Sequence, residues 1–264
     1  MEEIKDFNTY VSGMKKSYID KLFFMDKVKD INTVVDFGCA DGAMIREMYK
    51  AQPELKYIGI DNNPAMIDIA NIKTDKDCNI DYITEFNNSI SYSNAVLNLS
   101  SVIHEVYSYC KYDEIKEFWT NVFWRGFKYI SIRDFCVSKT VNRTADMNDY
   151  TKLVRSSDEY KIGNLVNDFE SIWGSLRDNR NMIHFLLKYR YKSNWDREVR
   201  ENYFPITLEQ LLSLIPTDKY EIVYFEDYVL PFTKDTVKHD FDIDLHDNTH
   251  VKLLLRRKSE LCIV

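Results

Sequence analysis

The sequence lacks any pair of cysteines with the CxxC spacing of a metal knuckle or redox motif. Its 5 cysteines are odd in number and scattered, so neither a structural zinc site nor a disulfide framework is indicated. This usage favours a reducing, cytoplasmic compartment. No apolar run approaches the roughly 20 residues that a membrane helix needs, and the N-terminus has no apolar signal core. We therefore expect no membrane partner.

The chain also lacks an excess of positive charge. It carries 35 Lys+Arg against 42 Asp+Glu, a formal net charge of −7. Such a protein does not bind nucleic acid through a positive field over its whole surface, although the net charge does not exclude a local basic patch. Hydrophobic residues make up 45% of the 264 residues and charged residues 29%, so a sizeable core is expected and global disorder is excluded.

Glycine is scarce, yet two of the 7 glycines, Gly38 and Gly42, lie within five residues of each other. They flank a predicted tight turn between a buried strand that contains Asp36 and a helix that begins at Ala43. Such a turn lets the backbone approach a ligand, with free N–H groups at the start of the helix. The spacing is not the G-x-G-x-x-G of a dinucleotide site, so a nicotinamide oxidoreductase is disfavoured.

Apolar periodicity predicts strands that alternate with helices over most of the chain. The predicted strands are 31–37, 57–61, 80–83, 95–100, 129–134, 220–225 and 250–256, and the predicted helices are 1–28, 43–51, 64–72, 112–123 and 208–215. This alternation is typical of an α/β fold with a largely parallel sheet. We expect one domain over 1–264, with an N-terminal helical cap at 1–28, a helical insert or lid at 137–203, and an acidic loop at 234–248.

Three segments carry a resemblance to a known family. They are VVDFGCADG at 34–42, YIGIDNNPAM at 57–66 and AVLNLSSVIHE at 95–105. In this order and spacing they resemble the motifs of class I S-adenosylmethionine-dependent methyltransferases, over about 30–135. The resemblance implies a Rossmann-like fold with seven strands, the last of them antiparallel. It also implies S-adenosyl-L-methionine as the cofactor and no metal.

The resemblance further implies where the cofactor lies. Asp36 would act near its amino group, Asp61 would accept hydrogen bonds from its ribose hydroxyls, and Ile83 would flank its adenine. Ser100 and Ser101 would lie beside the methyl-transfer centre. The implied cofactor-binding residues are Asp36, Gly38, Cys39, Gly42, Asp61, Asn62, Ile83, Ser100 and Ser101.

Two residues after the fourth predicted strand are candidate catalytic groups. His104 has the side chain for removing a proton from the acceptor near neutral pH, and Glu105 is the next residue. Each also has a structural interpretation, His104 as a hydrogen-bonded histidine at a helix start and Glu105 as a first-turn acid. Tyr107 and Tyr109 are nearby, and we expect them to shape the substrate pocket.

The insert offers a second clue to the substrate. Between 177 and 200 it holds seven basic and three acidic residues, interleaved with aromatics. Arg190 and Trp195 are therefore candidate substrate contacts, since such a patch stacks bases and neutralises phosphates. The same pattern also suits an amphipathic lid helix with aromatics in its core.

The end of the fourth predicted strand narrows the acceptor classes. Asn98-Leu99-Ser100-Ser101 is not the Asn/Asp-Pro-Pro-aromatic tetrad of enzymes that methylate exocyclic amines of DNA, and no proline precedes a cysteine, as cytosine C5 chemistry requires. We predict methyl transfer to a small or medium-sized acceptor by in-line displacement. The alternatives are an RNA methyltransferase that uses the insert and a non-catalytic subunit that binds the cofactor. The oligomeric state stays open.

Overall fold

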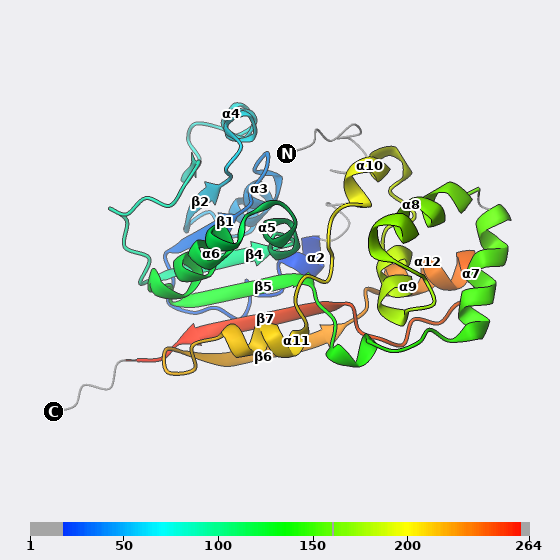
Figure 1. Ribbon diagram of the computed structural model, residues 1–264. Coiled ribbons are helices and arrows are strands. Elements are labelled where there is room, and N and C mark those ends of the chain that lie inside the picture. Colours follow the sequence, from blue (N-terminus) through cyan, green and yellow to red (C-terminus); the bar gives the residue numbers. More distant parts are fainter. Residues whose placement is uncertain (1–17, 160, 260–264) are drawn as a thin grey trace.

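The computed structural model describes residues 18–159 and 161–259, which form a seven-stranded sheet flanked by helices (Figure 1). The strand order is β3-β2-β1-β4-β5-β7-β6. The strands are β1 (Thr33–Phe37), β2 (Lys56–Ile60), β3 (Ile80–Ile83), β4 (Ala95–Ser100), β5 (Tyr129–Phe135), β6 (Tyr220–Tyr228) and β7 (His250–Arg257). Only β7 runs against its neighbours, pairing antiparallel with both β5 and β6. The predicted Rossmann-like sheet with an antiparallel last strand is confirmed.

Side chains alternate across the sheet, so each face has its own apolar layer. Val35 faces one layer, which contains residues of α5 (Ile103–Tyr109), α6 (Tyr112–Trp124) and α11 (Leu208–Leu214). Val34 faces the other, formed with α3 (Ala43–Ala51), α4 (Pro64–Ile72) and the segment after α2 (Tyr18–Lys21). The sequence determines these helices locally: Asn63 caps α4 by accepting the Ala65 N–H, and Pro64 stands at its first position.

A helical insert comes after β5 and lies beyond the carboxyl ends of the parallel strands (Figure 1). It contains 3₁₀ turns at Lys139–Val141 and Lys192–Asn194, and the helices α7 (Met147–Glu159), α8 (Gly163–Trp173), α9 (Asn179–Leu186) and α10 (Trp195–Glu198). Its apolar core is separate from the two layers on the sheet. The division of a single domain into a cap at 1–28 and an insert or lid at 137–203 stays a prediction.

Two predicted segments differ in the structure. The helix predicted over 1–28 ends at Lys21 within the described residues, and 22–27 form turns; the residues before 18 lie outside the described part. The acidic stretch at 234–248 is not a loop throughout, because α12 occupies Pro231–Phe241. Val237 and Phe241, four residues apart, bury their side chains in the core of the insert, which outweighs the polar composition that suggested a loop.

No helix among the described residues has both the length and the apolar character to cross a bilayer. The four described cysteines, Cys39, Cys78, Cys110 and Cys136, are free thiols.

Candidate functional site

A cavity of about 830 Å³ opens at the carboxyl ends of β1, β2 and β4. Here the chain order reverses, since β1 is flanked by β2 on one side and β4 on the other. In open α/β sheets such a switch point leaves a crevice in which ligands bind. The wall also includes Arg197, which comes from the insert.

The turn between β1 and α3 forms one wall of the cavity. Gly38, Ala40 and Gly42 all have a positive φ, at 77°, 46° and 73°. A Cβ on Gly38 would come within 2.8 Å of Val102 Cγ2, and one on Gly42 would clash with the Tyr82 ring. The two glycines therefore let the turn pack closely against Val102 and Tyr82, so that the turn does not fill the cavity.

Asp61 comes directly after β2 and joins this turn to the next helix. Its Oδ2 accepts the Ala40 N–H at 2.9 Å, and its Oδ1 accepts the Asn63 N–H at 2.9 Å. A carboxylate oxygen accepts more than one hydrogen bond, so both oxygens keep capacity for a ligand in the cavity. This geometry suits a pair of adjacent hydroxyl groups.

Charged and unsatisfied groups gather where β1 and β4 end. Asp36 Oδ1 accepts from Asn98 Nδ2 at 2.8 Å. Its Oδ2 and the Ser100 hydroxyl, both buried, have no hydrogen-bond partner among the described residues. Burial raises the pKa of Asp36 to about 7, against the hydrogen bond from Asn98 and the charge of Lys21. Burial and then Arg133 lower the pKa of Lys21 to about 8.

This end of the cavity suits a zwitterion. Lys21 and Asp36 both line it, with an ammonium on one and a carboxyl on the other. A ligand with a free amino acid end would offer an ammonium to Asp36 and a carboxylate to Lys21, and each pairing replaces part of the solvation lost on burial. The residues present therefore fit the amino acid end of S-adenosylmethionine, and Asp61 fits its ribose.

Residues 34–124 match the family model described as a methyltransferase domain. The matched segment contains β1, the Gly38–Gly42 turn and Asp61. These residues form a methyltransferase domain, in the seven-stranded sheet that the resemblance to class I S-adenosylmethionine-dependent methyltransferases implied. The cofactor of such a domain is S-adenosyl-L-methionine, which carries an activated methyl group on a sulfonium.

No curated protein matches the sequence of this methyltransferase. Among solved structures it is similar to the MccD protein, at 13% identity and a TM-score of 0.49, covering 93% of this chain and 98% of that chain. A SAM-dependent methyltransferase from Methanosarcina mazei is 17% identical, with a TM-score of 0.46 and coverages of 90% and 98%. Geranyl diphosphate C-methyltransferase from Streptomyces coelicolor A3(2) is 10% identical, with a TM-score of 0.48 and coverages of 93% and 82%. Likenesses this distant say nothing about the acceptor.

The structure of the methyltransferase brings most of the predicted site residues to one cavity. Those that line it are Asp36, Gly38, Cys39, Asp61, Asn62, Ser100, Ser101, Glu105 and Tyr109. Gly42 does not line the cavity; because it lacks a Cβ, it lets the turn pack against the Tyr82 ring. Ile83 is not in the wall either, because the chain turns after β3 and its neighbour Thr84 lines the cavity instead.

His104 lies behind the cavity wall. Its side chain is buried, and Nδ1 is 2.6 Å from Asp134 Oδ1. Burial opposes its protonation, but Asp134, Glu105 and Glu201 outweigh burial and raise its pKa. A ring enclosed in this way does not line the space where an acceptor would bind. The structure therefore does not place His104 where a direct general base would contact the acceptor.

Three predicted substrate contacts of the methyltransferase lie elsewhere, which corrects their placement. Tyr107 packs against the sheet, and its hydroxyl accepts the Trp119 indole N–H at 3.0 Å. Trp195 is buried in the core of the insert and donates to Asp168 Oδ2 at 3.1 Å. Arg190 is on the surface of the insert, 3.5 Å from Asp240 Oδ2. The two aromatic side chains are held by apolar packing, and Arg190 is paired with an acid of α12.

The structure brings Lys21, Arg197 and Glu201 to or beside this cavity. The sequence did not single out Lys21 or Glu201, and it offered Arg197 only as part of the basic patch for RNA. Lys21 precedes every recognisable motif, and its only sequence signal is a cation in a predicted helix with an apolar face. Arg197 and Glu201 are four residues apart in the polar insert and form an ion pair of 2.7 Å. An i, i+4 pair of opposite charge is common on solvated helices, so it gives no hint of a site.

Proposed function

We propose that this chain transfers the methyl group of S-adenosylmethionine to a small or medium-sized acceptor by in-line displacement. The observation that supports this most is the position of Arg197. Its side chain is 7% exposed, lines the cavity, and reaches from the insert to Glu105 of α5 at 3.2 Å. An insert fastened over the cavity in this way favours an acceptor that fits beneath it.

The chain's own residues would contribute positioning and exclusion of water. Asp36, Asp61 and Lys21 would hold the cofactor at its amino acid and ribose ends, with Gly38 and Ser101 beside it. Glu105 and Tyr109 would contact the acceptor from α5. Holding two reactants in line in a closed site accounts for a large part of the rate of such displacements.

The RNA alternative loses much of its support with the side chains in place. Lys188 is fully buried and donates to two backbone carbonyls, those of Glu198 and Glu201. Tyr189 and Trp195 are also buried. Four basic residues between 177 and 200 stay exposed, Arg177, Arg190, Lys192 and Arg200, but Tyr191 is the one exposed aromatic in this stretch, which is a small surface for stacking bases.

Label transfer from methyl-tritiated S-adenosylmethionine tests the proposal. The purified protein is incubated separately with the low-molecular-mass fraction of a cell extract and with total RNA. We expect labelled product in the low-mass fraction and none in RNA beyond a control without enzyme. Label in RNA alone would contradict the small acceptor, and binding of the cofactor without label in either fraction would favour the non-catalytic subunit. The reducing cytoplasmic location stays a prediction from the cysteines.

A further inference from the structure

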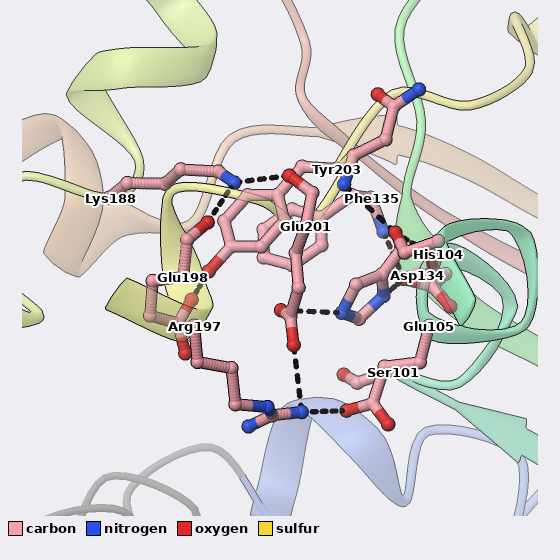
Figure 2. Close-up of polar contacts among 12 residues, drawn as sticks. Ser101, His104, Glu105, Asp134, Phe135, Lys188, Arg197, Glu198, Glu201 and Tyr203 are labelled. Carbon is pink, nitrogen blue, oxygen red and sulfur yellow. Dashed lines mark hydrogen bonds and ion pairs between the residues drawn. The ribbon is translucent and has the colours of Figure 1, made fainter. Parts of the chain in front are cut away.

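A buried carboxylate, Glu201, lies at the seam between the insert and the sheet (Figure 2). Its Oε1 accepts from Arg197 Nη2 at 2.7 Å and from the Tyr109 hydroxyl at 3.0 Å. Its Oε2 is 3.9 Å from Nε2 of His104. Tyr109 and Arg197 line the cavity, whereas Glu201 and His104 do not. Glu201 is therefore one hydrogen bond removed from the acceptor space.

The charges around Glu201 hold it close to the balance between its two protonation states. Burial and then Glu198 raise the pKa of Glu201 to about 7, against the pull of Arg197. On its far side His104 is itself paired with Asp134, whose two oxygens also accept the N–H groups of Ile103 and Phe135. The charged and titratable groups that face Glu201 or His104 are Glu105, Tyr109, Asp134, His184, Tyr191, Arg197, Glu198, Tyr203 and His250, and Lys188 bonds the Glu201 carbonyl.

We propose that Tyr109 and Glu201 together take the proton that the acceptor loses, so that the acceptor is a hydroxyl or an uncharged amine. The inference rests on the proposed function, because it needs a small acceptor in the cavity. A phenol oxygen has two acceptor sites besides its own proton. Tyr109 can thus accept a hydrogen bond from the acceptor while it donates to Glu201.

Atoms and electrons balance in this step. The nucleophilic oxygen or nitrogen forms a bond to the methyl carbon, and the carbon–sulfur bond breaks with its electron pair staying on sulfur. The acceptor's proton passes to the Tyr109 oxygen as the phenol proton passes to Glu201 Oε1. Glu201 ends protonated and later releases that proton to solvent. A base whose pKa lies near the working pH is the most effective for such a transfer.

His104, Asp134 and Arg197 are positioning residues in this arrangement. Arg197 and, when it is protonated, His104 flank the two oxygens of Glu201 and favour its ionised form. Asp134 fixes the orientation of the imidazole through the 2.6 Å bond to Nδ1. Tyr203 stacks on Phe135 of β5 at 4.0 Å between ring centroids, which keeps this part of the insert against the sheet.

The kinetic test compares Glu201→Gln and Tyr109→Phe with Tyr112→Phe, an exposed tyrosine at the start of α6, in the labelled low-mass assay. We expect the first two to lower kcat by roughly 10²–10⁴-fold and leave KM for S-adenosylmethionine unchanged. In the wild type kcat should fall as pH drops below about 7, because protonated Glu201 cannot accept a proton. That decline should disappear in Glu201→Gln. Unchanged rates with an unchanged pH profile would overturn the proposal.

A second readout needs no acceptor. The histidine rings are titrated by NMR in protein saturated with S-adenosylhomocysteine. Removing the charge of Glu201 should move the titration of His104 to lower pH in Glu201→Gln, because one of the carboxylates that favour the imidazolium is gone. An unmoved titration would overturn the coupling. Absence of label in the wild-type reaction would count against the small acceptor. The NMR titration would still test whether Glu201 and His104 are coupled.

Discussion

Asp61→Ala weakens binding of S-adenosylhomocysteine by about 1.5–3 kcal/mol, roughly ten- to 150-fold in Kd. The substitution removes two charge-assisted hydrogen bonds that the carboxylate can make to ribose hydroxyls. It also frees the N–H groups of Ala40 and Asn63, which loosens the turn beside the cavity. Both effects act on the ligand, and neither removes apolar core.

Calorimetric titration measures this effect, with Asp68→Ala as the matched control. Asp68 is an exposed acid on α4, outside the cavity wall. Thermal melts of both variants show whether a loss of affinity comes with a loss of fold. Wild-type affinity in a folded Asp61→Ala protein would remove Asp61 from the site.

Lys21→Met weakens the binding of S-adenosylhomocysteine by a similar amount, about 1.5–3 kcal/mol, because it removes the cation that would face the ligand's carboxylate. An analogue without that carboxylate should bind wild type and variant alike. The lowered pKa of Lys21, about 8, adds a pH dependence. Above this pH the amine is neutral in the free protein, so binding must take up a proton and affinity falls as pH rises.

Proton uptake is measured by calorimetry above pH 8 in two buffers with different ionisation enthalpies. The uptake should be present in the wild type and in Lys29→Met, which changes an exposed lysine, and absent in Lys21→Met. An equal loss of affinity for S-adenosylhomocysteine and for the analogue without the carboxylate would show that Lys21 stabilises the fold rather than binding the ligand's carboxylate.

Much of the fold could be predicted from the sequence because its signals are local. Pro64 and Asn63 give the start of α4, the pair Gly38 and Gly42 gives the turn, and apolar runs give β1 and β4. The helix α12 was missed because its burial depends on Val237 and Phe241 meeting α7–α9, which lie far away in sequence. Nothing within residues 231–241 themselves reveals that surface.

The site divides in the same way. Asp36, Asp61 and the serines after β4 were predictable because one sheet edge gathers the residues that come after each strand. The acceptor side was not, because it forms from two parts of the chain. Glu201 lies 92 residues from Tyr109, and their hydrogen bond exists only once the insert has packed on α5. Trp195 was misplaced for a related reason, because it is buried in the insert's own core, against residues distant from it in sequence such as Leu153 and Phe169.

The central claim is that the cavity at the carboxyl ends of β1, β2 and β4 binds S-adenosylmethionine. Calorimetric titration of the wild-type protein with S-adenosylmethionine, S-adenosylhomocysteine and NAD tests it most directly. We expect binding of the first two with a Kd on the order of micromolar, about −8 kcal/mol, and no heat with NAD. Absence of binding by either sulfur compound, in protein that melts cooperatively, would contradict the account and leave Gly38 and Gly42 as a structural turn.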